Sequence, residues 1–206
     1  MKKSCLASFA LFLFLLFTLP ARGDVLREIE SRLVLAPVTR GDFVQTRQLV
    51  NIKKPLVSKG HFLVAREAGV LWENRTPFPQ TTRLTRAEIV QTDANGKPLM
   101  RLSADREPAI KLINSILFAV LSGDLSTLAQ YFAAEGEVKG TGWKARFTPR
   151  DASLARILKS LTLTGASAVT QVEMENATGD FTRIVFQNQH HAQSLTDTEK
   201  RQFSAP

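Results

Sequence analysis

The chain has 206 residues, in which 27 Lys and Arg outnumber 19 Asp and Glu, so its formal net charge is +8. This length suits one domain with a substantial core. The basic residues are spread out, without the runs of about five to eight that mark a nucleic-acid-binding patch. The composition therefore argues against nucleic acid as a partner and leaves anionic lipid headgroups or an acidic protein open.

The N-terminus predicts a secretory signal peptide. Two lysines precede an almost unbroken apolar run at residues 6–19, which is shorter than the ~20 residues of a membrane-spanning helix. Small residues, Ala21 and Gly23, stand three and one positions before Asp24, as signal peptidase requires. We place the cleavage after Gly23, with residues 1–23 as the signal and residues 24–206 as a single domain.

Cleavage changes the charge and the cysteine count of the mature chain. Loss of Lys2, Lys3 and Arg22 leaves 24 basic against 19 acidic residues, a net charge of +5. The single cysteine, Cys5, lies before the apolar run and is discarded with it, so the mature chain folds without a disulfide. Retention of the apolar segment as an uncleaved anchor is the alternative.

An amphipathic helix is expected over residues 24–36, because apolar residues recur there at helical spacing and Pro37 follows. The period then changes to two, and turn signals separate short polar and β-branched runs. These runs predict antiparallel strands at 43–50, 60–65, 70–74, 81–84 and 88–92.

Two helices are expected to interrupt the strands. Residues 108–121 begin with Pro108, which suits a first helical turn, and carry apolar residues along one face. A break at 122–124 precedes a short second helix that turns Leu125, Leu128, Ala129 and Phe132 inward.

The remaining third of the chain returns to strands. They are predicted at 138–141, 143–148, 160–164, 168–175 and 181–187, with a short helical crossover at 151–159 and a hairpin turn at 176–180. The tail from His190 is polar and is expected to be poorly ordered.

Together these elements predict a mainly β (α+β) fold. About three helices are too short to form a core of their own, so they must lie on the long antiparallel sheet. A twisted sheet of about ten strands tends to curl, and helices on its concave side would enclose an apolar cavity.

Several segments in this order resemble the LolA-like outer-membrane lipoprotein carrier family. They are the N-terminal helix followed by GDFVQ at 41–45, SKGHFLVAR at 58–66, GVLW at 69–72 with Pro77, GWKARFTP at 142–149 and FTRIVF at 181–186. No single segment is diagnostic, and the resemblance rests on their order and spacing over most of the mature chain.

The resemblance implies a half-open β-barrel capped by helices, whose interior holds lipoprotein acyl chains in transit through the periplasm. It also implies a monomer without catalysis, catalytic residues, metal or cofactor, which meets an inner-membrane release transporter and an outer-membrane acceptor. Arg66 matches an arginine that hydrogen-bonds the lid helices and closes the cavity. We assign the cavity to Phe62, Val64, Val70, Trp72, Ile113, Ile116, Leu117, Val120 and Leu121.

Plainer roles compete with these assignments. Arg66 could be a solvated strand residue, the commonest environment of an arginine, and the apolar face of 108–121 could be ordinary core. The chain also lacks the family's Asp-Gly turn and aromatic strand, and has residues 86–97 in their place. The cargo could therefore be a non-protein envelope lipid or a polyene-type pigment.

An enzyme is the alternative from another class. An exported hydrolase or lipid-modifying enzyme would use His61, His190 or His191, the only histidines. The mature chain has no cysteine, and His61 is expected on a strand distant from the other two, which argues against a metal site. The chain has no Gly-x-Ser-x-Gly nucleophile elbow.

Overall fold

A computed structural model describes residues 22–204 except 104, 106–111, 113, 114, 117 and 121. Of the predicted signal peptide, only Arg22 and Gly23 are described, as the first residues of a helix. Both the cleavage after Gly23 and the domain boundaries stay predictions.

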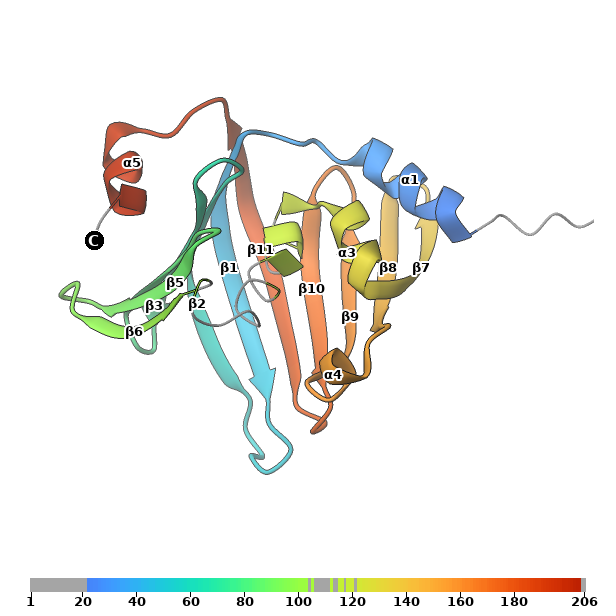
Figure 1. The fold of residues 1–206 in the computed structure, drawn as a ribbon, viewed down its shortest axis with the longest axis horizontal. Coiled ribbons are helices and arrows are strands. Elements are labelled where there is room, and N and C mark those ends of the chain that lie inside the picture. The colour runs from blue at the N-terminus through green and yellow to red at the C-terminus, as the bar shows by residue number, and fades with distance from the viewer. Residues whose placement is uncertain are drawn as a thin grey trace, which may run out of the picture.

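One antiparallel sheet of eleven strands dominates the described residues (Figure 1). Its strands are β1 Val38–Gln48, β2 Leu56–Ala65, β3 Gly69–Thr76, β4 Gln80–Leu84, β5 Glu88–Asp93, β6 Pro98–Ser103, β7 Phe132–Lys139, β8 Gly142–Pro149, β9 Leu158–Gly165, β10 Val169–Asn176 and β11 Phe181–Ala192. Their spatial order is β6-β5-β4-β3-β2-β1-β11-β10-β9-β8-β7. The sheet is curved and does not close, which confirms the predicted fold class.

Four helices have described bounds: α1 Arg22–Arg32, α3 Leu125–Tyr131, α4 Ala152–Ala155 and α5 Asp197–Ser204. Residues 112, 115, 116, 118–120 and 122 are also helical, and we call them the helical segment. The helical segment and α3 lie over one face of the sheet, which we call the concave face (Figure 1). Within the described residues, no helix has the length and apolar character needed to cross a membrane.

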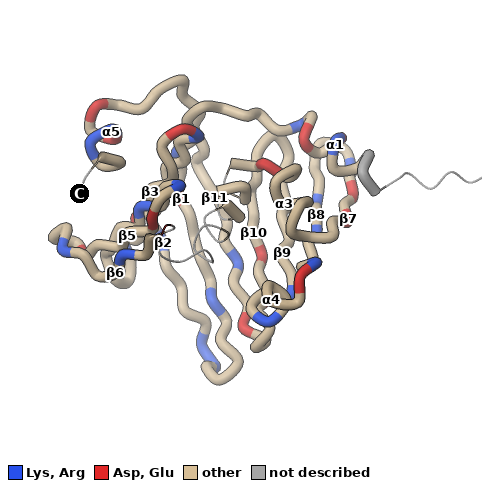
Figure 2. Tube along the Cα trace, viewed as in Figure 1, with Lys and Arg blue, Asp and Glu red and all other residues tan. Residues whose placement is uncertain are grey.

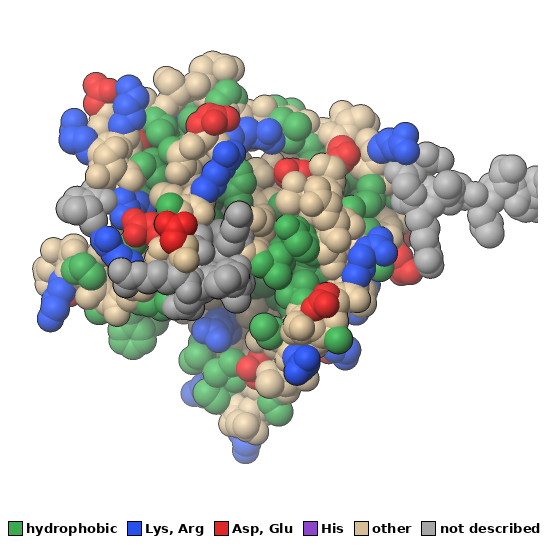
Figure 3. All heavy atoms as spheres, viewed as in Figure 1, with side chains coloured by type: hydrophobic (Ala, Val, Ile, Leu, Met, Phe, Trp, Pro, Cys, Tyr) green, Lys and Arg blue, Asp and Glu red, His purple; other side chains and the backbone are tan. Residues whose placement is uncertain are grey.

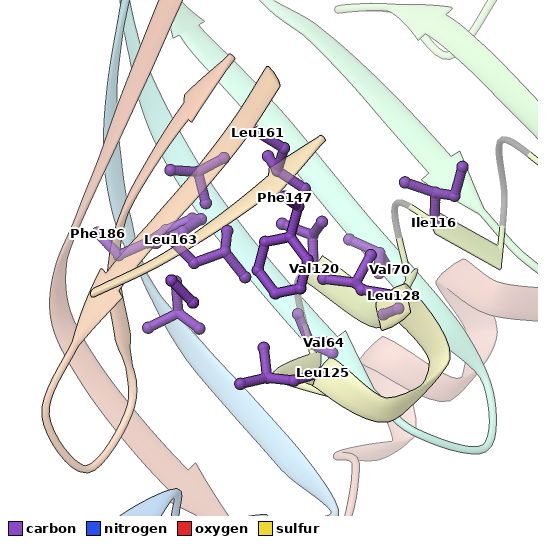
Figure 4. Packing of buried hydrophobic residues seen from close by; sticks show 14 of the residues in the cluster. Val64, Val70, Ile116, Val120, Leu125, Leu128, Phe147, Leu161, Leu163 and Phe186 are labelled. Carbon is purple, nitrogen blue, oxygen red and sulfur yellow. The ribbon is translucent and has the colours of Figure 1, made fainter. Parts of the chain in front are cut away.

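The main core lies between the concave face and these helices. In β8, buried Trp143, Ala145 and Phe147 alternate with exposed residues, as expected for a strand with one face against the core. Phe147, Leu161 and Leu163 from the sheet point toward Leu125 and Leu128 of α3 (Figure 4). Each such side chain contributes about 1.5–3 kcal/mol when fully buried, so this packing holds α3 on the sheet.

Helix α1 lies directly on β7, and a glycine permits the close approach. A Cβ atom at Gly136 would lie 3.0 Å from Val25 and 3.2 Å from Ile29. The helix ends at Arg32, four residues before the predicted end. The chain is no longer helical beyond Arg32. There the N–H of Val34 donates to the carbonyl of Ser167 in the turn between β9 and β10.

The C-terminal tail is ordered, so the prediction of a poorly ordered tail from His190 is wrong. Strand β11 continues to Ala192, and α5 follows on the convex face. Leu195 and Phe203 pack there against Val38, Leu63 and Leu71 in a second apolar cluster.

Polar contacts complete the docking of α5. Arg40 donates from Nε and Nη2 to the carboxylate of Glu199 at 2.5 and 2.6 Å. Arg83 is buried and donates from Nη1 to the carbonyl of Phe203 at 2.8 Å. These partners lie more than a hundred residues apart in the chain, which explains why the tail itself carries no signal of order.

Other element boundaries also differ from the predictions. Strand β1 begins at Val38 instead of residue 43. Gly41, which suggested a break, lies within the strand at a bulge between Arg40 and Asp42. Strand β6 was not predicted: it is an edge strand, mostly exposed, with no inward-outward alternation. Strand β7 begins at Phe132, where the second helix was expected to continue. Helix α4 lies in the predicted crossover at 151–159, but it joins β8 and β9, which are neighbours in the sheet, so the connection is not a crossover.

We predict that Glu199→Gln weakens the docking of α5 at neutral pH. The hydrogen bond from Arg40, with further bonds from Thr196, lowers the pKa of Glu199 from 4.5 to about 2. A carboxylate with a lowered folded-state pKa stabilises the fold above its unfolded pKa and loses that effect as pH falls through the folded value. The stability difference between wild type and Glu199→Gln should therefore shrink between pH 4.5 and about 2.

Urea unfolding at a series of pH values measures this difference. Asp197→Asn is the matched control, because Asp197 is an exposed carboxylate on the same helix and its ion pair is with exposed Lys200, and surface changes of this kind usually stay within about 0.5 kcal/mol. A constant difference for Glu199→Gln across the pH series would contradict the prediction.

Candidate functional site

A cavity of about 270 Å³ lies on the concave face, beneath the helical segment. Both halves of the sheet and the helical segment contribute to its wall. The lining residues are Gln45, Val70, Trp72, Thr82, Leu84, Ile116, Val120, Leu158, Leu161, Val172, Met174, Ile184 and Phe186. No Asp, Glu, Lys or Arg is among these described residues, so the cavity offers an apolar, uncharged environment. Figure 3 shows hydrophobic side chains gathered near the middle of this face.

Strand register places these side chains together. Val70 pairs with Leu84 and Trp72 with Thr82 across β3 and β4. On the other side, Val172 pairs with Ile184 across β10 and β11. Because partners across an antiparallel pair share a face, each pair contributes two residues to the same wall.

Four aromatic rings form a rigid floor beside the cavity. Phe43 stacks on Trp72 with ring centroids 3.8 Å apart, and Phe186 meets Trp72 edge-on at 6.2 Å. Phe62 meets Phe186 edge-on at 4.9 Å. Such pairs add about 0.5–1.5 kcal/mol each beyond area burial, which favours one fixed arrangement of the floor.

The predicted cavity residues divide into three groups. Val70, Trp72, Ile116 and Val120 line the cavity. Phe62 and Val64 face the same side of the sheet but do not line it, because they are buried among core side chains. The third group, Ile113, Leu117 and Leu121, lies outside the described residues.

Figure 4 shows how the first group converges. Val70 from the sheet and Ile116 and Val120 from the helical segment extend into one cluster. Sequence reasoning missed the sheet residues contributed by β4 and by β9–β11, and also Phe43 in the floor. Their alternation was visible in the sequence, but only the strand order brings them to one wall.

Arg66 contacts the end of the helical segment. It directly follows β2, its backbone N–H bonds to the carbonyl of Pro37 at 3.0 Å, and Nη2 donates to the carbonyl of Ser122 at 3.2 Å. Ser122 is the last residue of the helical segment, and Gly123 follows with a φ of 71°. A cation at a helix C-terminus also complements the helix dipole. That this bond closes the cavity stays a prediction.

Asp124 begins α3 next to this contact. Its carboxylate accepts from the backbone N–H of Thr127 at 2.9 Å and from the hydroxyls of Thr127 and Ser126 at 2.8 Å. Partial burial opposes ionisation, yet these hydrogen bonds and nearby Arg66 together hold the pKa of Asp124 below its usual value. The break between the helical segment and α3 is therefore a charged, capped junction.

The histidines do not line this cavity, and His61 and His190 are closer together than predicted. His191 lines a small separate pocket with Phe62, Ser122 and Phe186. His61 on β2 and His190 on β11 flank β1 and line a depression of about 560 Å³ on the convex face, beside α5. His61 pairs with Asp42 through Nδ1. Hydrogen bonds from Asn188 and His61 hold the pKa of Asp42 below its usual value. Among the described residues, no three His, Cys, Asp or Glu side chains are arranged to hold a metal ion.

Comparison with known proteins gives a family match. A family model described as "Outer membrane lipoprotein carrier protein LolA-like" matches residues 19–202. No curated protein matches the sequence.

Solved structures with a similar arrangement share little sequence. A LolA superfamily protein, NE2245 from Nitrosomonas europaea, has 11% identity and a TM-score of 0.46, over 86% of this chain and 96% of that chain. A DUF1329 family protein from Desulfovibrio piger has 10% identity and a TM-score of 0.46, over 85% and 93%. The MucA/MucB complex of Pseudomonas aeruginosa has 16% identity and a TM-score of 0.40, over 84% and 59%.

Proposed function

The chain belongs to the LolA-like family of outer membrane lipoprotein carriers, and from this premise we propose that it carries lipoprotein acyl chains in its concave cavity. The carrier is periplasmic and non-enzymatic. It takes cargo from an inner-membrane release transporter and passes it to an outer-membrane acceptor.

The uncharged lining of the cavity carries this proposal. Apart from Gln45 and Thr82, the described lining side chains are apolar. Each methylene that such a wall removes from water contributes about 0.8 kcal/mol. Burial of part of an acyl chain therefore supplies ample binding free energy. None of the described lining residues carries a charge that would pair with a charged substrate.

The described cavity corresponds to a closed state. Its volume of about 270 Å³ lies just below the roughly 300–1,000 Å³ of pockets that hold drug-sized ligands. A lipoprotein with several acyl chains therefore requires a larger cavity. The aromatic floor is fixed by ring packing, so the helical segment is the wall that moves.

The bond between Arg66 and Ser122 suits a latch on that wall. It is a half-buried hydrogen bond from a charged donor, a type that contributes about 1.5–3 kcal/mol. A contact of this size holds an empty cavity shut and yields to cargo, because cargo that prefers the open state shifts the equilibrium toward it.

A non-protein lipid is the second candidate cargo. The small closed volume requires less expansion for one short apolar molecule than for several acyl chains. The exported-hydrolase alternative gains nothing from His61 and His190, which lie on the convex face, away from the cavity. His191 lines a separate small pocket that shares Phe186 with the cavity, and its ring bonds to Thr39.

We predict that Val172→Phe impairs cargo binding. Val172 lies in the cavity wall, so the larger ring occupies space that cargo needs, and we expect the affinity for a fluorescent triacylated lipopeptide to fall at least tenfold. Val185→Phe is the matched control, because Val185 on β11 points to the convex face opposite Val44. Fluorescence titration measures both variants, and equal affinities for wild type and Val172→Phe would contradict the proposal.

We predict that Arg66→Leu raises lipopeptide affinity at least tenfold and slows release, because loss of a hydrogen bond worth about 1.5–3 kcal/mol favours the open state. Stopped-flow dissociation measures the release rate. Arg32→Leu is the control: Arg32 also donates from Nη1 to a carbonyl, that of Gly140, at 2.7 Å, away from the cavity. Unchanged affinity and release in Arg66→Leu would remove its role as a latch.

A further inference from the structure

Exposed apolar side chains gather at the end of the sheet where β1 turns into β2. The side chains of Val50 and Ile157 are 63% and 67% exposed. With three further exposed residues they form what we call the basal patch, which consists of Val50, Ile52, Leu56, Val57 and Ile157. The β1–β2 hairpin that carries most of it projects beyond the rest of the sheet (Figure 1). Exposed apolar patches of this kind mark interaction sites.

Hydrogen bonds hold this end of the molecule in shape. Gln48 donates from Nε2 to the carbonyl of Ile52 at 2.7 Å, inside the β1–β2 turn. The N–H of Val50 donates to Oδ1 of Asp180 in the β10–β11 turn at 3.0 Å. The N–H of Ala177 donates to the carbonyl of Ile157 at 3.1 Å. Three turns are thereby tied together, and the patch is a fixed surface.

The patch covers both faces of the hairpin. Leu56 lies opposite Arg47, and the next residue, Val57, lies opposite Thr46. Successive strand residues point to opposite faces, so apolar groups protrude on both sides of the tip. A tip that is apolar on both sides suits insertion into a medium that surrounds it, whereas a protein partner would cover one face.

Basic residues predominate around the patch, where the Asp180 carboxylate also lies against the N–H of Val50. Residues 43–66 contain no Asp or Glu, whereas Arg47, Lys53, Lys54 and Lys59 lie within the hairpin. All four are exposed, and none forms an ion pair with another described residue. Basic residues mark the lower tip in Figure 2, and Figure 3 shows hydrophobic and basic side chains together at that end. This combination complements an anionic lipid surface.

The patch adjoins one end of the cavity. Ile157 belongs to the patch, and the next residue, Leu158, lines the cavity. Gln45, also in the cavity wall, lies three residues before Gln48 of the tip on β1. Contact at the patch would therefore bring this end of the cavity close to the bilayer.

We propose that the basal patch docks the protein on an anionic membrane surface, with the apolar tip in the headgroup region and Lys53 and Lys54 against lipid phosphates. This membrane contact goes beyond the proposed function, because it rests on the surface alone and is independent of the cargo.

Co-sedimentation with phosphatidylcholine vesicles, with and without phosphatidylglycerol, tests the proposal on residues 24–206. We expect binding only to the anionic vesicles and weaker binding at high salt. The Lys53→Gln/Lys54→Gln variant should lower partitioning about 25-fold, about fivefold for each basic residue near the surface. The Val50→Ser/Ile52→Ser variant should lower it at least tenfold.

Matched controls come from the opposite end of the sheet. Val34 and Leu35 are both 54% exposed, and Val34→Ser/Leu35→Ser should leave partitioning unchanged. The same holds for Lys139→Gln/Lys144→Gln near the turn between β7 and β8. Absence of binding to anionic vesicles, equal binding to both vesicle types, or an unchanged Val50→Ser/Ile52→Ser variant would overturn the proposal.

Lipopeptide titration in solution separates this proposal from the carrier function. The basal-patch variants should bind lipopeptide as wild type does, because they leave the cavity wall intact. Wild type that binds vesicles but takes up no lipopeptide would contradict the carrier function alone. Wild type that takes up lipopeptide but ignores anionic vesicles would overturn membrane docking alone.

Discussion

The pairing of β1 with β11 is the constraint on which the rest of the structure depends. It joins the meander β1–β6 to the meander β7–β11 over ten residue pairs, and it sets Phe43 opposite Phe186 in the floor. The cavity draws Val70 and Leu84 from one meander and Leu161 and Val172 from the other. Neither meander alone would provide two walls, so the cavity exists only because the first and last strands meet.

The two sides of the cavity differ in how they are held. The sheet side combines continuous strand ladders with stacked aromatic rings, and small shifts there would break many contacts at once. Among the described residues, Ile116 and Val120 hold the helical segment through apolar contacts, and Arg66 donates a hydrogen bond to its last residue. This asymmetry suits a carrier, because cargo can displace the weaker wall without disturbing the fold that positions the stronger one.

The contact of Arg66 with the helical segment was expected from the family resemblance, and the roles of the predicted cavity residues in binding stay predictions. Local patterns in the sequence predicted most strands and the helical segment. They failed where distant partners decide the structure. Helix α5 is ordered by Arg40 and Arg83, which lie far from it in the chain, and His61 and His190 meet only because both flank β1. Strand β6 escaped prediction because an exposed edge strand needs no alternation. Phe43 and Phe186 were both predicted to lie in strands. The sequence did not show that these two strands are neighbours, so it did not predict the contact.

Hydrogen exchange with and without a triacylated lipopeptide tests most directly the claim that cargo enters by moving the helical segment over a fixed sheet. The account predicts faster exchange on cargo binding at the amides of Ile116, Val120 and Ser122, where the segment leaves the sheet. Exchange in β1 and β11 should stay unchanged, since the floor keeps its ladder. Unchanged exchange in the segment, or altered exchange confined to the central strands, would contradict the claim.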